Sequence, residues 1–293
     1  MGDEQGSARR FIADFCESKV AVGGFVMCCL VVLAAIFAPL ITPQDPYYLA
    51  GLDLMDSRLP PGEVGMSGMT HWLGTDDQGR DLYSAIIYGL RISLGVGVAA
   101  GVFALLIGTT VGLTAAYFGG RTDTLLMRVV DFQLSFPAIL LALVLLAVLG
   151  QGVDKIIIAL VAVQWAYFAR TMRSAALVER EREYIDAAKC LGLGDRRIMF
   201  RHLMPNCLPP LIVVATVQVA TAIALEATLS FLGLGMPVTE PSLGLLIANG
   251  FEYILSGRYW ISIFPGIALL ITIVSINLVG DRVRDVLNPR LQR

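Results

Sequence analysis

Charged residues are scarce in this sequence. Lysine, arginine, aspartate and glutamate together make up 16% of the 293 residues, whereas hydrophobic residues make up 56%. The mean hydropathy is +0.71. Soluble domains carry about 25% charged residues, so the composition excludes an ordinary water-soluble domain and indicates a protein that lies in a membrane.

Cysteine and histidine are also few. The five cysteines lie near the predicted inner ends of helices or within the first apolar run: Cys16, Cys28, Cys29, Cys190 and Cys207. None falls in a predicted outer loop, so we expect no disulfide framework. The two histidines, His71 and His202, lie in segments that we assign to opposite faces of the membrane, so we predict no metal site.

Motifs for nucleotide binding and covalent catalysis are missing as well. The sequence contains no G-x-x-x-x-G-K-[ST] loop, so we expect no ATP and no other cofactor to bind to this chain itself. The stretch GMSG at 65–68 is similar to the G-x-S-G of rhomboid proteases, and His71 lies nearby. That chemistry needs a serine and a base within the membrane bundle, whereas Ser67 lies in a predicted outer loop. We therefore predict that the chain is not an enzyme.

Long apolar runs are abundant. Six of them reach the length of about 20 residues that a helix needs to span a bilayer: 20–41, 92–118, 126–149, 156–178, 207–232 and 261–280. The first run is too long for the core of a cleaved signal peptide and follows two acidic residues, so we expect a retained anchor. The predicted fold is an all-α membrane protein with six transmembrane helices.

Two further patterns concern the second run. Its glycines form two G-x-x-x-G pairs, Gly97 with Gly101 and Gly108 with Gly112. Such pairs either mark a close helix contact or only reflect the frequency of glycine in membrane helices. Residues 80–91, just before the run, carry apolar side chains at helical spacing, and we predict a separate amphipathic helix that lies along the outer interface.

The distribution of basic residues predicts the orientation. With the N-terminus inside, 17 of the 22 lysines and arginines fall in inner segments. Cytoplasmic segments carry such an excess, so we expect both termini in the cytoplasm. The predicted organisation is a cytoplasmic N-terminus, a first helix, a periplasmic segment, a five-helix core with a cytoplasmic loop at 179–206, and a cytoplasmic tail: 1–19, 20–41, 42–91, 92–280 and 281–293.

The loop between the fourth and fifth runs is polar and basic. Residues 183–206 read EYIDAAKCLGLGDRRIMFRHLMPN, which predicts a helix, a tight turn at Gly192 and a second helix capped by Asp195. The predicted faces are Tyr184, Ala187, Ala188 and Leu191 in the first helix, and Ile198, Met199, His202 and Leu203 in the second. A flat alanine surface suits docking into another protein, although alanine is also the best helix former and arginine follows the orientation rule.

Within this loop, DAAKCLG is followed nine residues later by HLMP. The pattern resembles the EAA loop of permease subunits of ABC importers: Ala187, Ala188, Gly192 and Pro205 match it, and Asp186 replaces its glutamate. HLMP departs from the general pattern and is similar to the version in the dipeptide and oligopeptide branch. Further stretches resemble the C-type permease of that branch: LGTDDQGRDLYSAIIYGLRISL at 73–94, AYFGGRTDTLLMRVVDFQLSFP at 116–137, LSFLGLG at 229–235 and GDRVRDVLNPRL at 280–291.

The resemblance implies a permease subunit of a binding-protein-dependent importer. The implied partners are a second permease subunit, two ATPase domains that bind ATP and Mg²⁺, and a periplasmic solute-binding protein, with no nucleic acid. The residues expected to couple to the ATPase are Asp186, Ala187, Ala188, Gly192 and Pro205. The implied substrates are peptides, and dipeptides, oligopeptides, nickel complexes and glutathione-like peptides all stay open. The alternative is a secondary transporter driven by an ion gradient, although that class usually has more spans and several intramembrane acids.

Two groups of charged residues outside this loop are candidate sites. Glu226 lies deep in the fifth run, where a carboxylate is costly unless it is paired or faces water. It either lines the translocation path or makes a structural hydrogen bond. Asp76, Asp77, Arg80 and Asp81 belong to the acidic outer segment. They either form a surface for the binding protein or belong to a solvated loop in which the acids cap turns.

Overall fold

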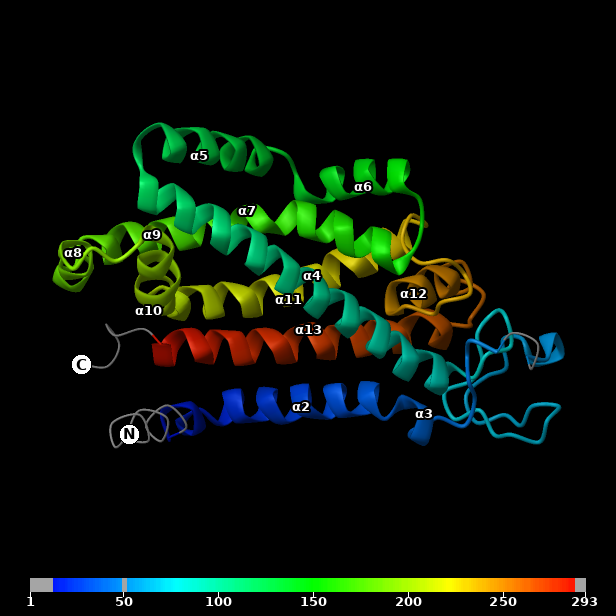
Figure 1. The fold of residues 1–293 in the computed structure, drawn as a ribbon. Coiled ribbons are helices and arrows are strands. Elements are labelled where there is room, and N and C mark those ends of the chain that lie inside the picture. Colours follow the sequence, from blue (N-terminus) through cyan, green and yellow to red (C-terminus); the bar gives the residue numbers. More distant parts are fainter. Residues whose placement is uncertain (1–12, 49–51, 288–293) are drawn as a thin grey trace.

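The computed structural model describes residues 13–48 and 52–287, and the described residues form a bundle of helices (Figure 1). The predicted all-α fold is confirmed: within these ranges, pairing of extended backbone is limited to two isolated bridges in the outer segment. The beginning of α2 (Lys19–Ile36) and the end of α13 (Trp260–Leu287) lie at the same end of the bundle (Figure 1). Residues 1–12 of the predicted N-terminal segment and residues 288–293 of the predicted tail lie outside the described residues.

Within the described residues, five helices are long and apolar enough to cross a membrane, and a bent pair of shorter helices passes the same test when taken together. The long helices are α2, α4 (Leu82–Phe118), α7 (Val153–Arg180), α11 (Leu208–Phe231) and α13, and the bent pair is α5 (Gly120–Leu134) with α6 (Ala138–Leu149). Shorter elements lie in the connections between the long helices. They include α3 (Ala38–Ile41) and η2 (Leu54–Asp56) between α2 and α4, and α12 (Leu243–Phe251) between α11 and α13.

The third apolar run is not the single straight helix that the sequence predicts. The chain bends by 88° between α5 and α6. The break falls at Ser135–Pro137, where Ser135 still has helical dihedrals and Pro137, with a ψ of 125°, does not. A proline removes a backbone donor and pushes the residue before it out of the helical region. The stretch Ser-Phe-Pro therefore ends α5 and lets α6 begin in a new direction.

The predicted separation between an interfacial helix and the second span is wrong. α4 is continuous over 37 residues, which corresponds to about 55 Å at 1.5 Å per residue. Asp81 caps it, because its carboxylate accepts a hydrogen bond of 2.9 Å from the backbone N–H of Ser84. The apolar side chains of its first turns are buried against α2, α12 and α13 instead of facing lipid. The amphipathic pattern therefore reflects burial between helices.

The glycine pairs of α4 mark two close helix contacts. A Cβ atom at Gly97 or Gly101 would press against side chains of α11. A Cβ atom at Gly108 or Gly112 would overlap backbone atoms of α7. The structure therefore favours the first of the two alternatives: the four glycines let α4 pack closely against its neighbours.

Candidate functional site

The polar loop between α7 and α11 is a compact helical segment, which we call the coupling segment (residues 181–207). It contains α8 (Glu183–Cys190), α9 (Asp195–Arg197), the π-helical turn η3 (Ile198–Leu203) and α10 (Met204–Asn206). It lies at the end of the bundle where α2 begins and α13 ends (Figure 1). The predicted turn is confirmed, since Gly192 has a φ of +68° and the backbone N–H of Leu193 donates to the Ala188 carbonyl at 3.2 Å.

The inner side of the coupling segment belongs to the core of the bundle. Ile185 and Ala188 of α8 are buried in one apolar cluster with residues of η3, α4, α7 and α11. The predicted face of α8 is only partly right: Ala188 is 5% exposed, whereas Leu191 is 78% exposed. The larger Ile185 turns inward together with Ala188, because the two lie three residues apart on one helix face. The segment is therefore fixed firmly to three long helices.

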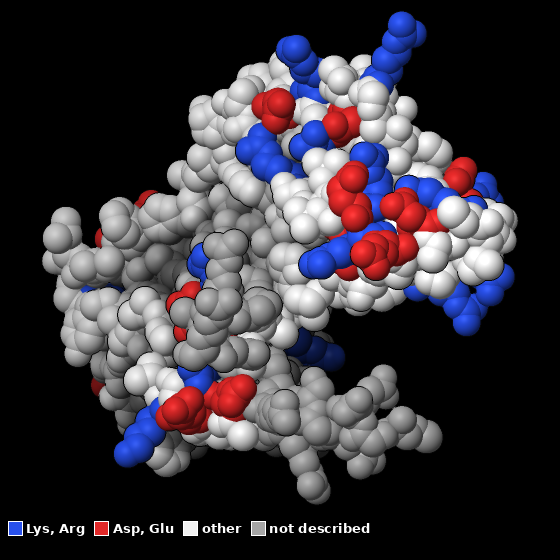
Figure 2. Space-filling view, turned by 90° about the vertical axis from the view of Figure 1, so that its left-hand side faces the viewer, with Lys and Arg blue, Asp and Glu red and all other residues white. Residues whose placement is uncertain are grey.

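The outer side of the coupling segment is exposed to solvent. Among the residues expected to couple, Ala188 faces the core, whereas the others are exposed at the surface: Asp186, Ala187, Gly192 and Pro205. Figure 2 shows this end of the molecule, where acidic and basic side chains lie interspersed. The arrangement combines a rigid support with an exposed patch of small and charged side chains, as a docking surface requires.

Asp195 does not cap the second helix as predicted. Gly194 occupies the cap position and no side chain completes the cap. The Asp195 carboxylate instead accepts a hydrogen bond of 2.7 Å from the hydroxyl of Tyr117, at the inner end of α4. Pro205 lies in the first turn of α10, and the chain continues through Cys207 into α11.

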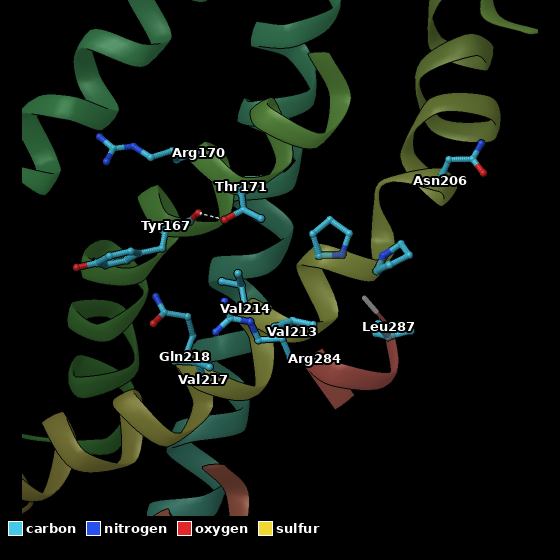
Figure 3. A pocket seen from close by; sticks show the side chains of 12 residues that line it. Tyr167, Arg170, Thr171, Asn206, Val213, Val214, Val217, Gln218, Arg284 and Leu287 are labelled. Atoms are coloured by element: carbon cyan, nitrogen blue, oxygen red, sulfur yellow. Dashed lines mark hydrogen bonds between the residues drawn. The ribbon is translucent and has the colours of Figure 1, made fainter. Parts of the chain in front are cut away.

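A groove opens beside the coupling segment, with a volume of about 920 Å³. Its walls come from α7, α10, α11 and α13 (Figure 3). The lining is mostly apolar on α11, with two arginines at the sides: Tyr167, Arg170, Thr171, Asn206, Pro209, Pro210, Val213, Val214, Val217, Gln218, Arg284 and Leu287. Sequence reasoning missed this groove, because four elements that are distant in the chain supply its walls.

Glu226 lies inside the bundle with no exposed surface. Ser93 of α4 donates a hydrogen bond of 2.8 Å to its Oε2, and Ser230 of α11 donates one of 2.8 Å to its Oε1. The carboxylate therefore links α4 to α11 through a satisfied polar cluster. This geometry favours the structural alternative that the sequence left open, and it gives no support to contact between Glu226 and a solute in this conformation.

Three of the four candidate charged side chains of the acidic outer segment (residues 42–91) point inward. Asp76, Arg80 and Asp81 have no exposed surface, and only Asp77 of the four candidates is partly exposed. Asp76 accepts hydrogen bonds from the backbone N–H groups of Gln78 at 2.8 Å and Arg80 at 2.9 Å. Burial raises the pKa of Asp76 to about 6, although the Arg80 charge opposes the shift. In this conformation a partner cannot contact the buried side chains of Asp76, Arg80 and Asp81, so they do not form a docking surface.

Arg80 and Asp81 also tie the outer segment to its surroundings. Nη2 of Arg80 donates to the carbonyl of Val238 at 2.7 Å, which joins the outer segment to the chain between α11 and α12. Oδ1 of Asp81 lies 3.1 Å from Nδ1 of His71, and both side chains are buried. No spacing in the sequence pointed to the contact between His71 and Asp81.

Comparison with known families agrees with this architecture. Residues 108–293 match the family described as binding-protein-dependent transport system inner membrane component. Residues 7–61 match the N-terminal transmembrane domain of oligopeptide transport permease C. The chain belongs to this family of inner membrane transport components, and it is a multi-pass membrane protein. The family suggested by the loop motif is confirmed.

Relatives match nearly the whole chain. A protein of Brucella suis described as a peptide transport system permease is 45% identical over 92% of this chain and 87% of its own length. The di/tripeptide transport system permease protein DppC of Pseudomonas aeruginosa is 37% identical over 97% of this chain and 92% of its own. Among solved structures, the inward-facing MetNI methionine ABC transporter has a similar fold, with a TM-score of 0.57 and 22% identity over 70% of this chain and 97% of that chain.

Proposed function

We propose that this chain is one of two permease subunits of an ATP-driven peptide importer. It forms half of the translocation path and transmits the motion of separate ATPase subunits, which bind ATP and Mg²⁺, through the coupling segment. A periplasmic binding protein delivers the cargo, and both termini lie in the cytoplasm. The names of the relatives support peptides as the cargo, and the excess of basic residues at inner segments supports the orientation.

The coupling segment is the observation that carries this proposal. Its outer face is exposed, while Ile185 and Ala188 pack into a core shared with α4, α7 and α11. A force applied to the exposed face therefore reaches three long helices together, because packed interfaces shift as units and do not deform continuously. The groove lies between the middle of α7, the first turns of α11 and the last turns of α13, so a displacement of these helices changes its shape.

The alternative of a carrier driven by an ion gradient has less support. Such a carrier depends on intramembrane acids that reach water or bound ions. Glu226 is enclosed and accepts hydrogen bonds from Ser93 and Ser230. The coupling segment would also have no partner in such a protein.

Affinity purification of the tagged chain from native membranes tests the proposal. We expect a P-loop ATPase and a second permease to copurify with the wild type. Asp186→Lys combined with Ala187→Arg places charge on the exposed face of α8, and this variant is expected to lose the ATPase and keep the second permease. Asp154→Lys, which changes an exposed carboxylate at the opposite end of α7, is the matched control and is expected to keep both partners.

Two outcomes would contradict the proposal. One is a wild-type chain that retains its fold in detergent and brings down no ATPase. The other is loss of the ATPase from the control as readily as from the α8 variant. Ala188→Arg is unsuitable for this test, because Ala188 is 5% exposed and a buried arginine would disrupt the core of the segment itself.

A further inference from the structure

We infer that Tyr117, Arg180 and Asp195 are positioning residues that clamp the coupling segment to the inner end of α4, so that the ATPase-driven motion of the segment is passed to that helix. The inference rests on the proposed function and assigns a task to three residues outside the docking surface. The clamp consists of hydrogen bonds between elements that are far apart in the chain.

The first contact joins α4 to α9. The hydroxyl of Tyr117 donates to Oδ1 of Asp195 at 2.7 Å, between residues 78 positions apart in the chain. The ring of Tyr117 also packs against the apolar cluster that holds the inner face of α8. A hydrogen bond to a carboxylate is stronger than one between neutral groups, and the packed ring fixes the direction in which the hydroxyl points.

The second contact comes from the end of α7. Nη1 of Arg180 donates to the carbonyl oxygens of Ala116 at 2.7 Å and Tyr117 at 3.3 Å. These carbonyls belong to the last turn of α4, where no further helical N–H can satisfy them and where a cation is favourable. Arg180 precedes α8 in the chain and Asp195 follows it. The end of α4 is therefore bonded to the chain both before and after α8.

The clamp acts on a helix that is suited to carry motion. α4 runs without a break from Leu82 to Phe118 and is packed closely on α7 through Gly108 and Gly112. Its outer end begins at Asp81, inside the buried charge cluster of the outer segment. A displacement at Tyr117 can therefore be carried along α4 to the outer end of the bundle. The core contacts of Ile185 would keep α8 in place without the clamp, so its loss should weaken coupling and leave the fold intact.

The test uses the complete importer in lipid nanodiscs and proteoliposomes, and it measures peptide imported per ATP hydrolysed. We expect Tyr117→Phe and Asp195→Ala each to lower this ratio at least about fivefold, the lower range for a coupling free energy. The double variant should be no worse than either single variant, because both remove the same hydrogen bond. Asp195→Asn should recover most of the ratio, since its amide oxygen still accepts from the Tyr117 hydroxyl.

Tyr48→Phe, at an exposed tyrosine of the outer segment, is the matched control and should keep the wild-type ratio. Additive effects of the two single variants, or a ratio that none of them changes, would overturn the clamp. Loss of ATPase copurification from Tyr117→Phe would also overturn it, since the residue would then only maintain the docking surface. Failure of the wild type to copurify an ATPase is a different result and contradicts the proposed function itself.

Discussion

The two polar segments at opposite ends of the bundle place their charges in opposite ways. In the outer segment, the side chains of Asp76 and Arg80 are both 0% exposed. In the coupling segment, the side chains of Lys189 and Asp186 are 47% and 68% exposed. Both segments are rich in acids and bases, so composition alone does not distinguish a segment that uses charge to fix its own shape from one that presents charge to a partner.

The difference follows from how each segment satisfies the hydrogen bonds of its backbone groups. In the described part of the outer segment, η2 is the only helical element before Asp81, so carboxylates accept backbone hydrogen bonds, as Asp76 does from Gln78. Buried backbone N–H groups must find acceptors, and aspartate is well suited to such local bonds. The coupling segment is helical over most of its length, and helices satisfy their own backbone. Its side chains are therefore free for other contacts.

The largest expected effect is that of Arg80→Met. Removing the cation leaves Asp76 buried without its charged neighbour and removes the bond to Val238. Breaking a buried ion pair from one side costs about 3–5 kcal/mol, so we expect the outer segment to open locally. Limited proteolysis of the chain in nanodiscs should show faster cleavage of the outer segment at pH 7. Arg91→Met, at an exposed position on α4, is the control, and equal protection of both variants would contradict the expectation.

The next effect concerns pH. The pKa of Asp76 is raised from 3.8 to about 6 in the folded chain, so the folded state binds this proton more tightly than the unfolded state. The free energy of unfolding should therefore fall as pH rises from about 4 to about 6, by about 3 kcal/mol, and stay low above that range. Asp76→Asn should remove this dependence, because an amide does not titrate in this range.

Thermal unfolding in detergent across pH 4–7.5 measures this. Glu63→Gln, which changes an exposed carboxylate of the same segment, is the control and should keep the wild-type slope. A slope that survives in Asp76→Asn would mean that another group sets it.

A smaller effect is expected at Glu226. Glu226→Leu removes the acceptor of Ser93 and Ser230, and hydrogen bonds between membrane helices contribute about 0.6–1.7 kcal/mol. Glu226→Gln keeps an acceptor and should support assembly and peptide uptake at the wild-type level. Uptake lost from Glu226→Gln with assembly intact would instead identify the residue as part of the path.

Much of this arrangement was predictable from the sequence, since bilayer thickness fixes helix length and six apolar runs stand out. The bend at Pro137 was also readable from the proline rule but was overlooked. α12 was not predicted. The burial of Arg80 and the inward face of Ile185 could not be read from the sequence. Both depend on which distant elements cover them, and hydrophobic periodicity carries no information about that.

The smallest expected effect is the double change Asp186→Ala with Lys189→Ala. The two side chains form an ion pair of 3.1 Å three residues apart on α8, and both are well exposed. Such pairs contribute less than about 0.5 kcal/mol, so thermal unfolding should be nearly unchanged even though two charges are lost. The result is to be compared with that of Arg80→Met, because each variant removes one ion pair. A destabilisation of the double variant as large as that of Arg80→Met would mean that the exposed charges of the coupling segment maintain its fold, and the distinction between the two ends would fail. An unchanged stability combined with weaker ATPase binding would show that these charges serve the interface.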